Sequence, residues 1–417
     1  MKNLYHSDIY KFDTPVSSYW EDTSSENLQI DKLTKDTNSE IVVIGGGYTG
    51  LLCAINLIEN HNLDVILVEA GKIGWGASSR NAGFNCLPPS KMSFKKMQSI
   101  YGIEETKKFF RNSVEGSNHT KDIIKEYNID CDVTGESSYV VAHHKNKFEQ
   151  IKEQAEVYKS EFGIETKVYS KEEFDEIGHG GTEQYGAFSY KPGFAINPLK
   201  FVNGIAKHAL SKKLKIFEHT KVDKVNKENG SYVLETKEGS IRSKKIVVAT
   251  NGFYQEGLIP QMDGRVLPVI SNIIVTRKLN EDELNAHNFK TFSPIANTKN
   301  LLYYYRKLPD NRILFGTRGD LTGSDQSNLA MSKKMEKFLK DIFPKWSNVS
   351  IDYNWRGLIA LSQKLAPSIG KIDNEEIYYG FGYNGVGVSA APWTGKQLSK
   401  LVFSSNSKEL DISKIYK

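Results

Sequence analysis

Residues 41–50 read Ile-Val-Val-Ile-Gly-Gly-Gly-Tyr-Thr-Gly, and residues 64–70 read Asp-Val-Ile-Leu-Val-Glu-Ala. The first stretch is a short apolar run that ends in Gly45, Gly47 and Gly50, and apolar residues follow it at helical spacing. The second stretch is another apolar run, which ends in Glu69 roughly 20 residues after the last glycine, as the dinucleotide fingerprint requires. We therefore expect a βαβ unit that holds a dinucleotide.

Each part of this pattern has a physical role. Gly45 permits a tight turn, Gly47 lets the backbone approach a pyrophosphate, and Gly50 lets helix and strand pack closely. The N-terminus of the helix offers unpaired N–H groups to phosphates, and Glu69 can accept hydrogen bonds from ribose hydroxyls. Glycines also mark ordinary turns, but here strand, glycines, helix, strand and acid follow in the required order.

The residues after Glu69 indicate which dinucleotide it is. Residues 71–85 read Gly-Lys-Ile-Gly-Trp-Gly-Ala-Ser-Ser-Arg-Asn-Ala-Gly-Phe-Asn, where a nicotinamide enzyme would usually continue with another βα unit. Small residues let such a loop run closely along a long ligand, and Ser78 and Ser79 can meet phosphate or ring oxygens. The alternative is a flexible surface loop, because loop composition alone is permissive.

Composition excludes several classes of protein. The chain has 417 residues, which is long enough that two domains are expected, and 39% hydrophobic and 25% charged residues are typical of a globular protein. The net charge is only +5, so a nucleic-acid site is not expected. No apolar stretch reaches the length of a membrane span, and the polar N-terminus lacks the apolar core of a signal peptide. Cys53, Cys86 and Cys131 are widely spaced, without metal-ligand pairing, and favour a reducing cytoplasm. No metal site is expected.

Longer motifs show a resemblance to a known family. The runs Gly-Gly-Gly-Tyr-Thr-Gly and Glu-Ala-x-x-Ile-Gly-x-Gly-Ala-Ser-x-Arg-Asn-x-Gly resemble the D-amino-acid oxidase superfamily of FAD enzymes, and within it the branch of the gamma-glutamylputrescine oxidases. The likeness continues along all but about the first fifteen residues. The later motifs that carry it are Ser18-Tyr19-Trp20, Tyr127 to Asp132, Asn197-Pro198-Leu199, Tyr304-Tyr305-Arg306, Asp310-Asn311-Arg312, Trp355-x-Gly357 and Gly380 to Val388.

The resemblance implies an α/β fold in which a glutathione-reductase-type FAD-binding Rossmann domain is interleaved with an α+β substrate domain built on a large mixed sheet. The pattern of apolar and polar segments places the pieces. Residues 1–37 form an N-terminal extension. Residues 38–90, 195–255 and 365–417 form the FAD-binding domain, and residues 91–194 and 256–364 form the substrate domain. A helix from about Pro392 is expected to direct its N-terminus at the flavin.

The motifs and the resemblance together give a set of expected cofactor-binding residues. The backbone at the position matching Val222 contacts adenine in the family. The expected FAD-binding residues are Gly45, Gly47, Tyr48, Thr49, Gly50, Glu69, Ala70, Gly76, Ala77, Ser78, Ser79, Arg80, Asn81, Ala82, Gly83, Val222, Thr250, Asn251, Gly252, Gly382, Tyr383, Asn384, Gly385, Val386, Gly387 and Val388.

The expected catalytic or substrate-contacting residues are Arg80, Asn81, Tyr305 and Arg318. Tyr304 or Tyr305 can present an aromatic face to a cationic amine, although core packing explains either tyrosine as well. Arg306 and Arg318 can hold a carboxylate, although either arginine alone also suits the surface. Sarcosine-oxidase relatives use a lysine on the strand matching residues 313–320, and this chain has none there, which leaves Arg318 as the nearest cation.

Three functions remain open from the sequence. The first is FAD-dependent oxidation of the C–N bond of an amine or amino acid, with a gamma-glutamylated polyamine as the candidate substrate and oxygen or another compound as the electron acceptor. The second is a secondary amino-acid oxidase or dehydrogenase of the sarcosine or glycine type. The third, from another class, is a non-catalytic flavin-binding protein that assembles with a partner. The oligomeric state is open as well.

Overall fold

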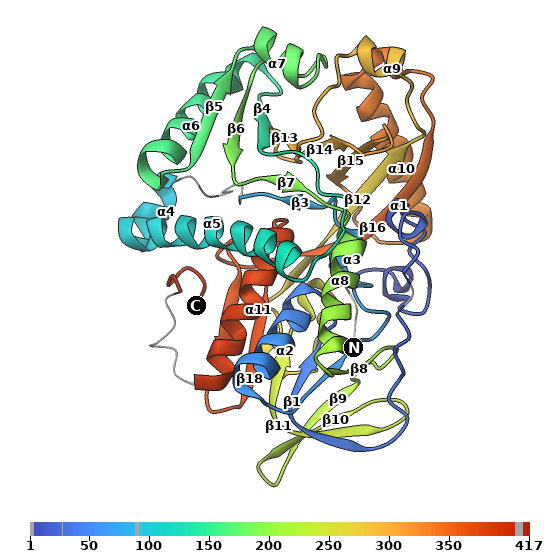
Figure 1. Ribbon diagram of the computed structural model, residues 1–417, viewed down its shortest axis with the longest axis vertical. Helices are drawn as coiled ribbons and strands as arrows, with labels where there is room; N and C mark the ends of the chain where they lie inside the picture. Colours follow the sequence, from blue (N-terminus) through green and yellow to red (C-terminus); the bar gives the residue numbers. More distant parts are fainter. Residues whose placement is uncertain (1–3, 27, 88–91, 93, 405–411) are drawn as a thin grey trace.

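Two eight-stranded sheets organise the computed structural model, which describes residues 4–26, 28–87, 92, 94–404 and 412–417. In Figure 1 the first sheet lies in the lower part of the view and the second in the upper part. The first sheet takes strands from the beginning, middle and end of the chain, so the two sheets are interleaved in sequence.

The first sheet has a parallel centre, in which β2, β1 and β11 are flanked by β8 and β18. All four residues of β2 are buried, which explains their continuous apolar sequence. Its strands are β17 (Ser368–Lys371), β18 (Ile377–Phe381), β11 (Ser240–Val248), β1 (Thr37–Ile44), β2 (Val65–Val68) and β8 (Lys215–Phe217). In addition, β10 (Ser231–Glu235) pairs with β11, and β9 (Lys224–Glu228) pairs with β10.

The second sheet is mixed, because β13 and β4 pair in parallel and its other neighbours pair antiparallel. Its strands, in spatial order, are β16 (Ile351–Leu361), β12 (Leu267–Thr276), β15 (Ile313–Arg318), β14 (Tyr304–Lys307), β13 (Ile295–Asn297), β4 (Ser138–Val141), β6 (Ala187–Lys191) and β5 (Glu165–Tyr169). A two-stranded ladder joins β3 (Phe84–Asn85) to β7 (Phe194–Ala195).

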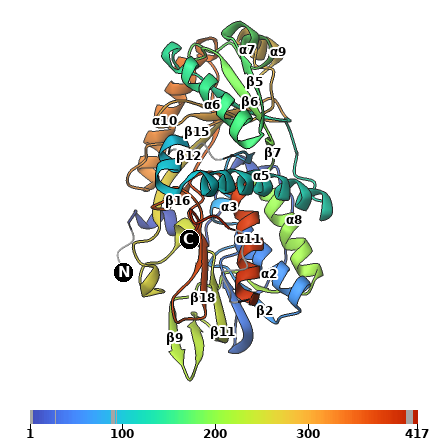
Figure 2. The same ribbon diagram turned by 90° about the vertical axis from the view of Figure 1, so that its left-hand side faces the viewer.

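Helices cover both sheets and run between them. Figure 2 shows α5 crossing the molecule above α11 and α2. The helices are α1 (Tyr19–Asp22), α2 (Tyr48–His61), α3 (Ala77–Arg80), α4 (Phe94–Tyr101), α5 (Ile103–Glu126), α6 (Phe148–Phe162), α7 (Lys171–Ile177), α8 (Pro198–Ser211), α9 (Glu281–Ala286), α10 (Asp325–Ile342) and α11 (Gly387–Ser404).

Small residues allow α11 to pack closely on two other helices. A Cβ at Gly116 of α5 would lie 2.8 Å from the carbonyl oxygen of Ser389, and one at Gly395 of α11 would lie 2.7 Å from that of Thr49 on α2. The hydroxyl of Thr120 on α5 donates to the carbonyl of Val388 at 2.9 Å. These contacts fix the first turn of α11 between α2 and α5.

One expected element needs correction. The helix expected from Pro392 begins at Gly387, with Pro392 inside it. The division into domains stays a prediction, and its boundary between residues 90 and 91 lies outside the described residues.

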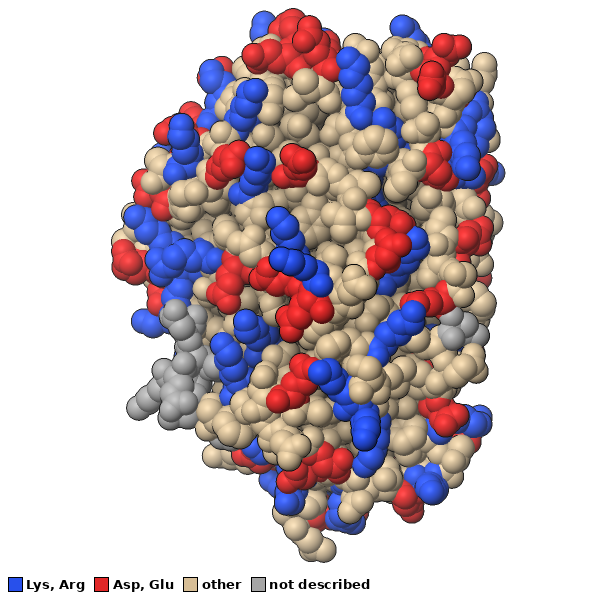
Figure 3. All heavy atoms as spheres, viewed as in Figure 1, with Lys and Arg blue, Asp and Glu red and all other residues tan. Residues whose placement is uncertain are grey.

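Charges of both signs are interspersed on the surface in Figure 3, and no extended patch of one sign covers that face. The small net charge of +5 therefore does not form a basic patch on the face shown. Within the part of the chain that the structure describes, no helix has the length and apolarity to cross a bilayer.

Candidate functional site

A cavity of about 950 Å³ reaches from the glycine turn of the first sheet to the inner face of the second. Its walls come from α2, the loop around α3, the carboxyl ends of β1, β2 and β11, strands β12 to β16, and the turn before α11. The predicted FAD loop and the predicted substrate sheet therefore face one common space.

The glycine turn has the geometry that its sequence predicts. Gly45 has φ +112°, and a Cβ there would lie 2.8 Å from the carbonyl oxygen of Ala249 on the neighbouring strand. A Cβ at Gly50 would lie 1.9 Å from the carbonyl oxygen of Gly45, so only glycine lets α2 begin this close to β1. Gly47 caps α2 without a side chain, and the positive end of the 14-residue helix meets the cavity there.

Glu69 follows β2 and lines the cavity. Its carboxylate accepts hydrogen bonds from the backbone N–H of Gly46 at 2.7 Å and of Gly71 at 3.0 Å. Burial raises the pKa of Glu69, and these two N–H groups oppose that effect by stabilising the charged form. The acid is thus fixed beside the glycine turn, with further lone pairs available to a ligand.

The turn before α11 brings a second helix N-terminus to the cavity. Val386, Gly387 and Val388 line it, and Gly385 has φ +96°. Because α11 begins at Gly387, the partial positive charge of this 18-residue helix reaches the cavity at its first turn. Asn384 also has a positive φ, of 55°, and its side chain joins the turn to the carbonyl of Gly382 at 2.6 Å.

Arg80 and Asn81 line the cavity but use most of their polar atoms within the protein. The Arg80 guanidinium donates to the carbonyls of Trp75 at 2.7 Å and Arg356 at 3.1 Å, and its centre lies 3.9 Å from the centroid of the Trp75 ring. Burial lowers the pKa of Arg80 to about 9. The Asn81 amide donates to the carbonyls of Ala77 and Ser78, each at 3.0 Å. Both side chains thus hold the loop in shape.

The neighbouring tyrosines of β14 face opposite ways, as strand residues do. Tyr304 lines the cavity, and its hydroxyl lies 2.8 Å from the hydroxyl of Ser271 on β12. Tyr305 is buried on the other face, where its hydroxyl lies 2.9 Å from Nε2 of His179. The structure therefore does not support Tyr305 as a substrate-contacting residue and offers Tyr304 instead.

The two candidate arginines, Arg306 and Arg318, also differ in position. Arg306 is 1% exposed and donates to the carbonyl of Ile196 at 2.7 Å, away from the cavity lining. Arg318, at the end of β15, lines the cavity, and its guanidinium lies against Gly385. Burial lowers the pKa of Arg318, and no carboxylate among the described residues pairs with it. Arg318 is therefore a charged donor available to an anion in the cavity.

The structure brings most of the predicted cofactor residues to the cavity wall. Those that line it are Gly45, Gly47, Tyr48, Thr49, Glu69, Ala70, Gly76, Ala77, Ser78, Arg80, Asn81, Ala82, Val222, Thr250, Asn251, Tyr383, Asn384, Gly385, Val386, Gly387 and Val388. Those that stand behind the wall are Gly50, Ser79, Gly83, Gly252 and Gly382. Val222 lies just before β9.

Part of the cavity wall was not predicted from sequence. Side chains of α6 and its neighbours form what we call the α6 wall, consisting of Lys147, Gln150, Gln154, Tyr158, Thr298, Lys299 and Asn300. It is formed by α6, the residue before it and the loop after β13; Figure 1 shows α6 and β13 in the upper part of the molecule and α2, which follows the glycine turn, in the lower part. Lys299 is paired with Glu183 at 2.7 Å, whereas Lys147 contacts only the amide oxygen of Gln150, at 3.1 Å, among the described side chains. No local motif marks these residues, because they come from two separate segments.

The cavity suits a long ligand with a pyrophosphate. Its wall contains two helix N-termini, a glycine turn that lets a ligand approach the backbone closely, and the fixed carboxylate of Glu69. The buried hydroxyl of Thr250, also in the wall, has no hydrogen-bond partner among the described residues. This set of donors and acceptors fits FAD. Among the described residues, no group of three or more His, Cys, Asp or Glu side chains is arranged to hold a metal ion.

Comparison with known sequences agrees with these features. The family described as "FAD dependent oxidoreductase" (DAO) matches residues 40–401. A gamma-glutamylputrescine oxidoreductase from Escherichia coli is 29% identical over 392 residues, which cover 93% of this chain and 89% of the relative. A probable oxidoreductase OrdL from Haemophilus influenzae is 26% identical over 96% of this chain and 91% of its own length.

Solved structures share the fold. A glycine oxidase from Geobacillus kaustophilus superposes with a TM-score of 0.71 at 17% identity, covering 89% of this chain and 96% of its own. An L-proline dehydrogenase from P. horikoshii gives a TM-score of 0.69 at 21% identity, covering 91% and 96%. The expected α/β fold with a large mixed sheet is thereby confirmed.

Proposed function

Because the chain belongs to the family of FAD-dependent oxidoreductases, we propose that it oxidises the C–N bond of an elongated amine, with a gamma-glutamylated polyamine as the leading candidate. Bound FAD supplies a flavin ring that accepts a hydride from a carbon next to nitrogen. The chain's own residues then have to bind the substrate, orient that carbon and exclude water.

The observation that carries this proposal is the extent of the cavity. Beyond the residues suited to FAD, it continues past Phe84 and Tyr304 to the α6 wall. On the second sheet its lining includes the apolar residues Val140, Ala296 and Leu302, and the α6 wall beyond them is polar. A substrate that fills it is long, with an apolar middle and a polar or anionic far end, as a gamma-glutamylated polyamine is.

We propose that two residues of the cavity wall, Tyr304 and Arg318, act near the reacting carbon. The Tyr304 ring is oriented by the hydroxyl contact with Ser271 and by an edge contact with Phe84, whose ring centroid is 5.9 Å away. An aromatic face in this position attracts a cationic amine. Arg318 places its guanidinium in the same cavity, beside the turn that precedes α11.

A second candidate follows from Arg318. A buried guanidinium without a carboxylate partner suits a substrate carboxylate next to the reacting carbon, as in secondary amino acids of the sarcosine or glycine type. The relatives include a glycine oxidase from Bacillus subtilis at 23% identity over 88% of this chain. The two candidates differ in where the anion lies, at Arg318 or at the α6 wall.

Anaerobic reduction of the bound flavin by candidate substrates tests the proposal. Gamma-glutamylputrescine, putrescine, sarcosine and glycine would each be mixed with the FAD-loaded protein while the absorbance of the oxidised flavin is followed. We expect the first compound to bleach the flavin fastest. Faster bleaching by sarcosine or glycine would favour the second candidate. No bleaching by any amine or amino acid would contradict both and leave a non-catalytic flavin-binding role.

The electron acceptor and the compartment are parts of the same proposal. The three cysteines are free thiols, which supports a reducing cytoplasm. The absence of a lysine from residues 313–320 leaves oxygen and other acceptors as alternatives.

A further inference from the structure

The N-terminal segment from Tyr5 to Thr14 lies outside residues 40–401, the part of the chain that the family matches. Two of its side chains, Tyr10 and Phe12, nevertheless line the cavity. Both are half-buried, between the glycine-rich loop after β2 and the short turn after β11.

Aromatic contacts join the segment to both of these loops. The Phe12 ring lies 4.8 Å from Trp75 and 6.3 Å from Phe253, measured between ring centroids. Tyr10 meets Phe253 edge-on at 6.5 Å, and Trp75 lies 5.5 Å from Phe253. All four aromatic residues line the cavity. Tyr10 and Phe12 thus supply two of the four rings of this aromatic cluster.

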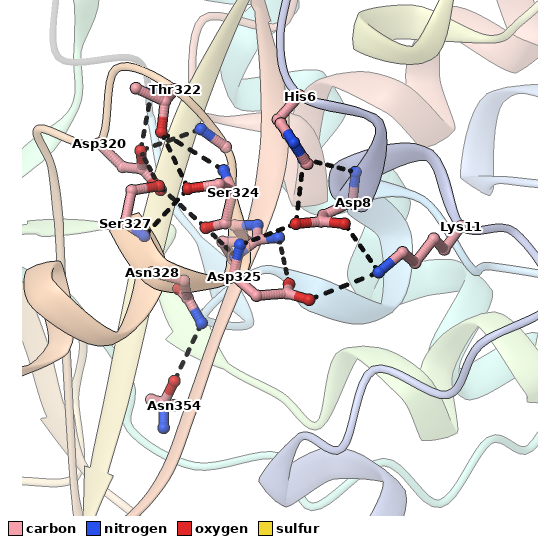
Figure 4. Close-up of polar contacts among 12 residues, drawn as sticks. His6, Asp8, Lys11, Asp320, Thr322, Ser324, Asp325, Ser327, Asn328 and Asn354 are labelled. Atoms are coloured by element: carbon pink, nitrogen blue, oxygen red, sulfur yellow. Dashed lines mark hydrogen bonds and ion pairs between the residues drawn. The ribbon is translucent and has the colours of Figure 1, made fainter.

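The start of the segment is attached to the second sheet (Figure 4). The backbone N–H of His6 donates to the carbonyl of Thr322 at 2.9 Å, and the carboxylate of Asp8 accepts from the backbone N–H of Asp325 at 3.0 Å. Lys11 lies 2.7 Å from Asp8 and 3.5 Å from Asp325. Between these contacts, Ile9 is 2% exposed and packs with Ile270 and Leu358.

The end of the segment is attached to the first sheet. Nε1 of Trp75 donates to the carbonyl of Thr14 at 3.1 Å, and Asp13 lies 3.0 Å from Nδ1 of His219, just after β8. The exposed ion pairs at both ends contribute little each, because solvent screens them. The backbone hydrogen bond of His6 and the buried Ile9 therefore carry most of the attachment.

We infer that residues 5–14 are part of the cofactor site, in which Tyr10 and Phe12 form an outer wall that keeps bound FAD from leaving. The segment is attached to each sheet and crosses the cavity between them. On this side, FAD exchange requires the segment to detach. The inference rests on FAD as the cofactor and is independent of the substrate.

The rate of FAD release tests this inference. The FAD-loaded parent, Phe12→Ala and the double variant Tyr10→Ala/Phe12→Ala would be diluted, and the rise in fluorescence of free flavin would be followed. We expect release about tenfold faster from Phe12→Ala, since burial of a phenylalanine side chain is worth that much, and faster still from the double variant. Phe12→Tyr keeps the aromatic wall and is expected to release FAD at the parental rate.

Phe403→Ala is the matched control, because Phe403 is 55% exposed on α11 and does not line the cavity. Release at the parental rate from both alanine variants would overturn the inference. If the double variant is purified without FAD, its melting temperature would be measured with and without added FAD. A smaller increase than in the parent supports the inference, and an equal increase contradicts it.

Discussion

The carboxylate of Glu69 accepts a hydrogen bond from the backbone N–H of Gly46 at 2.7 Å, which joins the end of β2 to the glycine turn that follows β1. The acid and the turn are 23 positions apart in sequence and form one rigid corner of the cavity. Glu69 therefore orders the turn and places its carboxylate in the wall of the cavity.

Replacement of Glu69 by Ala should weaken FAD binding at least tenfold. A hydrogen bond to a charged group contributes about 1.5–3 kcal/mol, and the variant loses this contact with the ribose as well as support for the turn. Titration of FAD-free protein with FAD measures the change in Kd. Glu40→Ala is the control, because Glu40 is exposed on β1 and does not line the cavity. An unchanged Kd in Glu69→Ala would remove Glu69 from the site.

The purified protein should be yellow and should release intact FAD on acid precipitation. Cys86 lines the cavity, but burial raises the pKa of its thiol to about 12, so at neutral pH it stays protonated and poorly nucleophilic. We therefore expect no covalent link. Chromatography of the supernatant identifies the flavin, and colour that remains with the precipitated protein would contradict the prediction.

Removal of the Arg318 charge should slow the reaction of the reduced enzyme with oxygen, if the enzyme is an oxidase. Oxygen reduction passes through negatively charged species, which a cation in a dry cavity stabilises, so Arg318→Met should lower the rate at least tenfold. Rapid mixing of substrate-reduced protein with oxygenated buffer gives the rate. Arg265→Met, at an exposed position, serves as the control. Reoxidation of the parent much more slowly than turnover with an artificial acceptor would instead indicate a dehydrogenase.

Replacement of Lys147 by Met should raise KM for a substrate with a distal carboxylate while leaving kcat near the parental value. Lys147 lies on the α6 wall and directly precedes α6, which Figure 1 shows in the upper part of the molecule, away from α2. We therefore expect it to contribute to binding equally in the ground state and the transition state. Steady-state kinetics would compare gamma-glutamylputrescine with putrescine. Lys152→Met is the matched control, since Lys152 is exposed on α6, which begins just after Lys147, and is paired with Glu149. A parental KM for both substrates would refute the role of Lys147.

Acid should destabilise the fold through His179. Its Nδ1 accepts from the N–H of Gly181 and its Nε2 lies 2.9 Å from the Tyr305 hydroxyl, and burial lowers its pKa to about 3. Below pH ~6.5 the His179 side chain therefore binds a proton in the unfolded chain but not in the folded protein. The free energy of unfolding falls by up to about 1.4 kcal/mol for each further pH unit, until the pH reaches the pKa of His179 in the folded protein.

Urea unfolding between pH 7 and pH 4.5, with FAD in excess, checks this prediction. His179→Gln should show a shallower loss of stability with falling pH than the parent. His144→Gln, at an exposed position, should keep the parental slope. Equal slopes in all three proteins would mean that other groups govern the acid sensitivity.

Local sequence patterns predicted the glycine turn and the acid after β2, which the structure brings together in the cavity wall. The turn at Gly45 and the acid at Glu69 depend on contacts within one βαβ unit, where spacing and residue type are both constrained. The start of α11 was misplaced, because proline favours a first helical turn but is also tolerated at Pro392, inside the helix. Tertiary contacts with α2 and α5 let the helix begin five residues earlier, at Gly387.

The residues that line the cavity from the second sheet were harder to predict. Sequence alone does not show which face of a sheet each strand residue points to. Tyr304 and Tyr305 are equivalent by residue type, and only the register of β14 against β15 puts Tyr304 toward the cavity. Lys147 and Phe12 lie in segments with no motif at all, and they reach the cavity through packing between distant parts of the chain.

The interleaving of the two sheets has a consequence for how the protein is made. The centre of the first sheet, β1 and β2, emerges early from the ribosome, but β17 and β18, at its edge beside β11, begin only at Ser368 and Ile377. The second sheet is translated almost entirely between these points, from β4 at Ser138 to β16 at Leu361. The nascent chain therefore carries an incomplete first sheet until synthesis is nearly finished, and apolar strands exposed during that time favour aggregation.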